Sequence, residues 1–99
     1  MAELDALIHQ PTRLRLMLVL AGVEEADFSF LAGTLGLTNG NLSTHAAKLE
    51  EAGYLESTKR FEGRVPNTTY RITARGKERL GEYWQALEEL RRSGGRGLG

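Results

Sequence analysis

The N-terminal third of the chain has the hydrophobic pattern of helices. Apolar residues first recur at helical spacing at Leu4, Leu7 and Ile8. Pro11 then suits the first turn of a second helix, where its missing N–H costs nothing. Between Leu14 and Leu20, apolar residues lie almost all round this second helix, and Gly22 ends it. We therefore predict two helices, the second of them central and buried.

Two further helices joined by a tight turn are predicted in the middle of the chain. A short extended segment over residues 27–29 offers Asp27 or Ser29 as the N-cap of the first helix, which ends at Gly36. Thr38 is the N-cap expected for the second helix, which runs to about residue 52. Its apolar face is formed by Leu42, Ala46 and Leu49. The length and turn of this pair match a helix-turn-helix.

The last part of the chain changes to an alternating pattern and then returns to helix. Residues 54–61 and 68–72 have strand character, and residues 62–67 between them are turn-rich, which predicts a β-hairpin. Thr73 is the N-cap expected for a last helix, whose apolar stripe is formed by Leu80, Tyr83, Trp84, Leu87 and Leu90. We expect one domain over residues 1–93, ending in this helix from about residue 73, and a flexible Gly-rich tail over residues 94–99.

The charge of the chain is unevenly distributed, although the net charge is zero. Residues 1–56 carry three Lys or Arg against eight Asp or Glu, a balance of −5. Residues 57–79, which include the hairpin, carry seven Lys or Arg against two Glu, a balance of +5. Such asymmetry indicates an anionic partner for the hairpin region, although a solvated hairpin is the simpler interpretation of the charges alone.

Several functional classes are disfavoured by the composition. The chain has no cysteine and two isolated histidines, so we expect neither a disulfide framework nor a metal site. It has no paired acids with a pocket signature and no Gly-rich phosphate loop, so we expect no catalytic residues, no enzyme activity and no cofactor. No apolar run is long enough to cross a membrane, and the acidic N-terminus does not look like a secretion signal. A cytoplasmic location is therefore expected.

Residues 4–90 resemble the stand-alone winged-helix transcriptional regulators close to the MarR and ArsR groups. The segments that carry this resemblance are HQPTRLRLMLVLA, DFSFLAGTLGLTNGNLSTHAAKLEEAGYL and KRFEGRVPNTTYRITARGK. The resemblance implies a mainly α fold with a small β-hairpin wing, an α+β winged helix-turn-helix. It also implies sequence-specific binding of double-stranded DNA by a homodimer that regulates transcription.

The resemblance places the recognition helix over about residues 38–52, in the major groove, and the basic wing over about residues 59–68, on phosphates or in the minor groove. The expected groove contacts are Asn39, Asn41, Ser43, Thr44, His45 and Lys48. The expected wing contacts are Lys59, Arg60, Arg64, Asn67 and Thr68. Arg64 suits a narrow minor groove. Two interpretations of His45 stay open, a base contact and a polar residue satisfied beneath the helix.

Dimerisation is expected through apolar residues near both ends of the chain. The candidate interface residues are Leu4, Leu7, Ile8, Tyr83, Trp84, Leu87 and Leu90. The alternative is packing against the chain's own core, and we expect the stripe on the last helix to serve both purposes. The resemblance also allows an unidentified small-molecule effector between the dimerisation helices and the DNA-reading half.

The chain departs from its relatives at two adjacent positions. Ala46 and Ala47 stand where relatives commonly carry a leucine and a basic residue, which predicts a smaller core contact and one phosphate contact fewer. The alternative function is a winged-helix module that assembles protein complexes without binding specific DNA. Zero net charge and the acidic first half favour that alternative, and a weak salt dependence of any DNA binding would support it.

Overall fold

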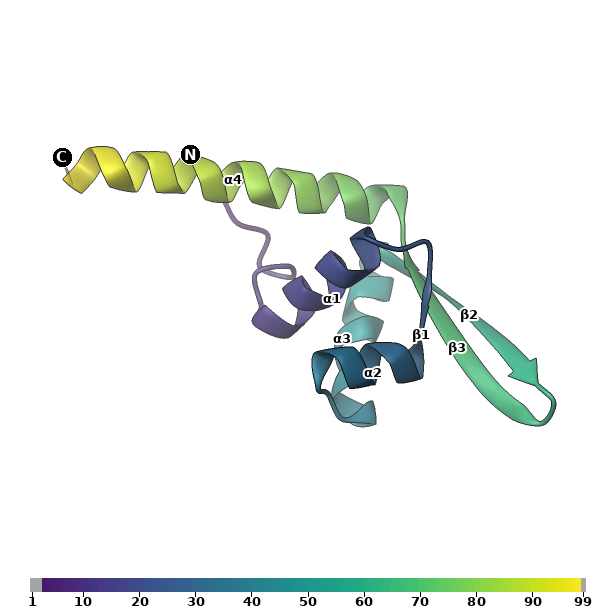
Figure 1. Cartoon of the computed structure of the whole chain (residues 1–99). Coiled ribbons are helices and arrows are strands. Elements are labelled where there is room, and N and C mark those ends of the chain that lie inside the picture. Colours follow the sequence, from purple (N-terminus) through teal and green to yellow (C-terminus); the bar gives the residue numbers. More distant parts are fainter. Residues whose placement is uncertain (1–2, 99) are drawn as a thin grey trace.

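The computed structural model describes residues 3–98, and the side chains of residues 3–94. Within these residues the elements are α1 (Pro11–Ala21), β1 (Ala26–Asp27), α2 (Phe28–Leu35), α3 (Asn39–Glu51), β2 (Leu55–Glu62), β3 (Val65–Ile72) and α4 (Ala74–Leu98). Helices α1–α3 form a compact group beneath α4, and the β2–β3 hairpin projects away from them (Figure 1). The predicted fold class, mainly α with a small β wing, is confirmed.

Most of the predicted helix ends are confirmed, because they depend on local hydrogen bonds. The side chains of Asp27 and Thr38 accept hydrogen bonds of 2.7 and 3.1 Å from the backbone N–H three residues ahead. Asp27, and not Ser29, is therefore the N-cap of α2. Gly36 ends α2 with a left-handed φ of 65°, which only glycine adopts at little cost.

The segment before α1 is not the helix that the sequence predicts. Residues 6–10 form turns and a bend. The side chain of Asp5 accepts backbone hydrogen bonds from Leu7 and Ile8 at 2.9 and 3.4 Å, and such local bonds compete with helix formation. The side chain of Ile8 is completely buried as a result of this turn.

Helix α1 is central, as predicted, because it packs against α2, α3, α4 and β3. Its buried side is formed by Leu16, Met17 and Leu20, all with no exposed surface. Burial is not complete, however, since Leu18 is 40% exposed. The nearly continuous apolar sequence thus overstated how much of this helix faces the core.

The three strands form an antiparallel sheet in the order β1–β3–β2. In the hairpin, β2 and β3 pair from Leu55 with Ile72 out to Glu62 with Val65, so the connecting turn is shorter than the predicted loop over residues 62–67. Pro66 lies within β3. It is tolerated there because β1 pairs only with Thr69 and Tyr70, so one edge of β3 is free at Pro66.

Helix α4 is longer than predicted, since it continues to Leu98. The helix thus covers residues 94–98 of the expected Gly-rich tail, and the flexibility of this segment stays a prediction. Met1, Ala2 and Gly99 lie outside the described residues. Within residues 3–98, no helix combines the length and the apolar composition needed to cross a membrane.

Candidate nucleic-acid interface

Helix α3 is held by one apolar face and exposes the opposite, polar face. Leu42, Ala46 and Leu49 are at most 1% exposed, as predicted, and they fix the rotation of the helix against the core. The exposed residues among the predicted groove contacts are Asn39, Asn41, Ser43, Thr44 and Lys48. The Thr44 hydroxyl donates to the Gly40 carbonyl at 2.9 Å, which leaves its lone pairs free to accept.

His45 differs from its neighbours on α3, because it is half-buried and tied to α1. Its Nδ1 lies 3.2 Å from Nη1 of Arg13. Since a guanidinium can only donate, Nδ1 accepts and the imidazole is neutral in this contact. Burial, followed by the charges of Arg13 and Lys48, holds the pKa of His45 below its usual value. Of the two open interpretations, the structure favours a polar residue satisfied beneath the helix.

Two arginines of α1 brace the helix-turn-helix, a role that the sequence did not reveal. Besides His45, Arg13 contacts the N-terminal segment, donating from Nε to the carbonyl of Leu7 at 2.6 Å. Arg15 donates from Nη2 to the carbonyl of Leu35 at 3.2 Å, at the last turn of α2. These bonds join α1 to both helices of the motif. They link distant positions, so no local sequence pattern indicated them.

The wing carries its cations at and near the tip of the hairpin. Lys59, Arg60 and Arg64 are exposed, whereas Asn67 and Thr68 are half-buried. Lys59 pairs with Thr68 and Arg60 with Asn67, so the two basic residues of β2 lie on opposite faces of the hairpin. Within the described residues, Arg60 lies 3.9 Å from a carboxylate of Glu25, and neither Lys59 nor Arg64 forms an ion pair.

The other cations of the basic segment are placed at the base of the hairpin and on α4. Arg71 lies 2.8 Å from Glu56, its partner across the sheet. Arg75 donates to the carbonyl of Ala52 at 3.2 Å and lies over the ring of Tyr54. Arg71 and Arg75 thus contact other groups of the chain, whereas Lys59, Arg60 and Arg64 are exposed on the wing.

A polar cluster joins the N-terminal segment to α4. The Asp5 carboxylate accepts from the Tyr54 hydroxyl at 2.6 Å and from the Arg79 guanidinium at 2.9 Å. Burial alone would raise the pKa of Asp5, but the hydrogen bonds from Tyr54, Arg79 and two backbone amides outweigh it and hold this pKa below its usual value. The pKa of Tyr54 is raised by burial and by the bond to Asp5.

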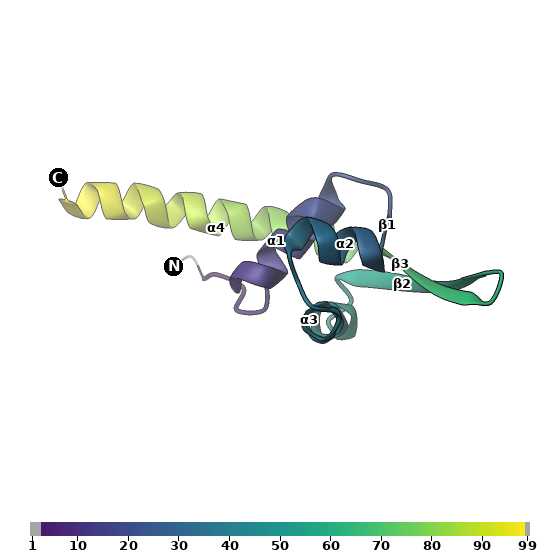
Figure 2. The same ribbon diagram turned by 60° about the horizontal axis from the view of Figure 1, so that its bottom comes forward.

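The candidate dimer residues divide into three groups by their exposure. Ile8 and Tyr83 are 0% and 4% exposed within the single chain, so they pack into its own core and offer little surface to a partner. Leu4, Leu7 and Leu87 are half-buried against that core. Trp84 and Leu90 remain 43% and 41% exposed on α4, which extends past the other elements (Figures 1 and 2).

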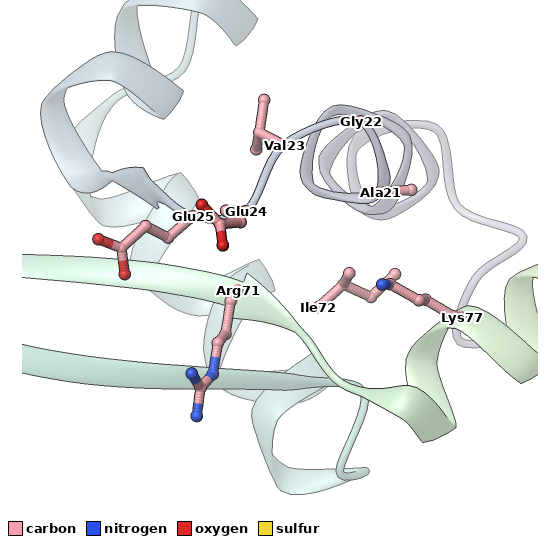
Figure 3. Close-up of a pocket in the computed structure, with 8 residues that line it drawn as sticks. All are labelled: Ala21, Gly22, Val23, Glu24, Glu25, Arg71, Ile72 and Lys77. Carbon is pink, nitrogen blue, oxygen red and sulfur yellow. The ribbon is translucent and has the colours of Figure 1, made fainter.

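Two surface hollows are candidates for a small ligand. One, of about 620 Å³, is lined by the loop at residues 21–25 and by Arg71, Ile72 and Lys77. Arg71 turns its guanidinium away from this space, across β2 (Figure 3). A second, more apolar hollow of about 310 Å³ lies between α1 and α4 and includes His9, Leu14 and Tyr83. Among residues 3–98, no three His, Asp or Glu side chains gather as metal ligands would.

Comparison with known proteins agrees with this geometry. Residues 12–91 match the model of a winged helix DNA-binding domain. An uncharacterized protein of Methanocaldococcus jannaschii, MJ0432, is 34% identical over 85 residues, which cover 85% of this chain and 91% of that protein.

Two solved structures are similar over most of their length. A transcriptional regulator homologue from Pyrococcus horikoshii OT3 is 30% identical, with a TM-score of 0.83, covering 90% of this chain and 88% of the other. A PadR family transcriptional regulator from Eggerthella lenta DSM 2243 is 29% identical, with a TM-score of 0.69 and coverages of 89% and 85%. The chain belongs to the winged helix DNA-binding domain family of transcriptional regulators.

Proposed function

We propose that this chain binds double-stranded DNA as a homodimer, with α3 in the major groove and the wing on phosphates and the minor groove, and thereby regulates transcription. One observation carries this proposal: the start of α3 and the tip of the wing both lie on the side of the molecule away from α4 (Figure 1). The exposed polar end of α3 and the exposed cations of the wing are thus available together to one duplex.

The chemistry of α3 suits base edges and phosphates. Asn39 and Asn41 each offer both donors and an acceptor, and Ser43 and Thr44 add hydroxyls. These residues stand in the first two turns of α3, where the helix dipole favours a phosphate group. Lys48, one turn later, supplies a cation on the same exposed face. Ala47, which is also exposed, adds no charge, so the major-groove side carries a single cation on each protomer.

The salt dependence of DNA binding tests the proposal quantitatively. Each protomer presents four cations to the duplex, Lys48, Lys59, Arg60 and Arg64. If all eight cations of a dimer contact phosphates, the slope of log K against log salt approaches about −7. The experiment is fluorescence anisotropy, with the DNA upstream of the protein's own gene and with an unrelated duplex, over a series of salt concentrations. Tight, salt-dependent binding that prefers the upstream duplex is expected.

A pair of matched variants tests where the DNA lies. Arg64→Ala should flatten the slope by about one unit for each protomer, since one cation fewer displaces counterions from the duplex. Arg92→Ala removes the same charge from an exposed position on α4, and we expect it to leave the slope unchanged. Absence of binding to either duplex at low salt would overturn the proposal and favour a protein-interaction module.

The homodimer in this proposal is supported by the apolar surface of α4. Trp84, Leu87 and Leu90 are spaced by three residues on a helix that continues beyond the core. A two-fold dimer would cover this stripe and would present two copies of α3 to half-sites about 34 Å apart. An effector that shifts this spacing would change the fit to DNA, and the apolar hollow beside His9 and Tyr83 is the candidate place for it.

A further inference from the structure

The tip of the wing carries two large apolar side chains that the core does not use. Phe61 is 68% exposed and Val65 is 66% exposed, more than any other large hydrophobic side chain among residues 3–94. A single exposed apolar residue is ordinary. Two of them on either side of a three-residue segment that ends in Arg64, within a cluster of cations, point to a contact with an anionic partner that also has apolar surface.

The strand register places these two side chains on opposite faces of the hairpin. Phe61 is paired with Pro66, and the next pair along the ladder is Glu62 with Val65. Paired residues share a face of a sheet and successive residues alternate between faces. Phe61 therefore stands on one face and Val65 on the other. A tip that is apolar on both faces fits between two walls better than it fits a flat surface.

A cation stands behind each apolar residue on the same face. Lys59 precedes Phe61 by two residues, and Arg60 is paired with Asn67, two residues beyond Val65. Two residues of a strand span about 7 Å, close to the depth of about 7.5 Å of a DNA minor groove. Inside that groove the walls are deoxyribose, and the phosphates stand at the rim. Each face of the wing likewise has an apolar side chain at the tip, where the deoxyribose lies, and a cation behind it, where the phosphates lie.

We propose that Phe61 and Val65 pack against the deoxyribose of the two strands that border the minor groove, while Lys59 and Arg60 reach the phosphates at its rim. The proposal rests on the proposed function, because it assumes that the wing meets DNA. The partner of the apolar tip is B-form duplex DNA, because the cations around the tip favour an anionic partner. Among residues 57–72 the only carboxylate is that of Glu62, which is paired with Val65 and lies on the same face.

The proposal predicts which DNA the wing prefers. Packed sheets lie about 10 Å apart, so a ribbon with side chains on both faces is about that thick. The minor groove is about 6 Å wide, so it must open to admit the tip. Opening costs less at flexible TA or CA/TG steps than in stiff, narrow A-tracts. A narrow groove would suit Arg64 alone, whereas the complete tip favours a deformable one.

The experiment compares serine variants of the tip by fluorescence anisotropy on a duplex that the wild-type protein binds. Phe61→Ser and Val65→Ser should each weaken binding, by about tenfold for the larger Phe61, without changing the salt slope, because neither residue carries charge. Leu18→Ser, an exposed apolar position on α1, is the matched control and should have no effect. Thermal melting should show that all three variants are folded, since these side chains are exposed.

A second measurement tests the opening of the groove. Two duplexes of equal length and base composition carry either TA steps or an A-tract where footprinting places the wing. Wild-type protein should prefer the TA duplex, and the Phe61→Ser/Val65→Ser double variant should lose that preference. If the wild-type protein binds and both single variants bind with the same affinity as the wild type, this inference alone is overturned. The same holds if the double variant keeps the preference for the TA duplex. No binding by wild-type protein would overturn the proposed function itself.

Discussion

The guanidinium of Arg79 on α4 donates a hydrogen bond of 2.9 Å to the carboxylate of Asp5, 74 positions earlier in the chain. The hydroxyl of Tyr54, just beyond α3, donates to the same oxygen at 2.6 Å. One carboxylate therefore joins the N-terminal segment, the residue that follows α3 and the start of α4.

Asp5→Asn should destabilise the protein by about 1–3 kcal/mol at pH 7, because charge-assisted hydrogen bonds are lost. Since the folded state holds the pKa of Asp5 low, its contribution is complete above the unfolded pKa of about 3.9 and is lost as the pH falls through the folded value. Urea unfolding between pH 7 and pH 2.5 measures this. The Asn variant should lose less stability over the acidic part of that range than the wild type.

The control for Asp5 is Glu3→Gln, which removes an exposed carboxylate two residues away. We expect it to change the free energy of unfolding by less than about 0.5 kcal/mol. If Asp5→Asn is no more destabilising than Glu3→Gln, the polar cluster does not secure α4.

Gly76→Ala should be strongly destabilising, although alanine is the better helix former. An added Cβ would lie 2.3 Å from the carbonyl oxygen of Tyr54 and 2.8 Å from Cγ1 of Ile72. Overpacking of this kind costs about 1–3 kcal/mol or more. Gly81→Ala is the matched control, because the same helix leaves open space there, and it should stabilise by up to about 1 kcal/mol. Thermal unfolding of both variants gives the comparison, and equal effects would contradict the close approach at Gly76.

His45 should make stability depend on pH in the weakly acidic range. Its pKa in the folded state lies below the unfolded value of about 6.5 because of burial and the charges of Arg13 and Lys48. Well above pH 6.5 the imidazole of His45 is neutral in both the folded and the unfolded state, so it does not make the free energy of unfolding depend on pH. As the pH falls from 6.5 toward the folded value, the unfolded state gains the proton first, so stability decreases. Urea midpoints at pH 7.5 and pH 5.5 should therefore differ more in wild-type protein than in His45→Gln.

The second histidine provides the control for this measurement. His9 is exposed, and its Nδ1 lies 2.9 Å from the hydroxyl of Tyr83. His9→Gln should keep the decrease in stability between pH 7.5 and pH 5.5. If His45→Gln retains that decrease as well, Arg13 does not constrain His45 in the way that the distance of 3.2 Å indicates.

The parts of the fold that were predicted from the sequence depend on near neighbours. The caps at Asp27 and Thr38 are bonds to the backbone three residues ahead, and the buried face of α3 follows from helical periodicity. Thr73 was predicted as the N-cap of α4, and the structure confirms it with a local hydrogen bond. The hydroxyl of Thr73 accepts from the N–H of Gly76, and only glycine leaves room there for the carbonyl of Tyr54.

The features that were missed depend on contacts between distant positions. Arg13 and Arg79 were counted as charges, although each holds two segments together. The turn before α1 forms because the side chain of Asp5 takes backbone amides that a helix would have used. The turn-rich composition of residues 62–67 predicts a loop at Pro66, and the free edge of β3 that admits this proline appears only once β1 is placed beside β3.

Trp84→Glu should convert the protein to a monomer. Trp84 is 43% exposed on a helix whose far half extends beyond the core, so a negative charge there is tolerated in the monomer but would be buried in a dimer, at a cost of several kcal/mol. Gln85→Glu adds the same charge at the next, exposed position and should leave the dimer intact. Sedimentation equilibrium gives the masses. DNA affinity should fall with the dimer, because one protomer reads only one half-site. A Trp84→Glu protein that sediments as a dimer would exclude this face of α4 from the interface.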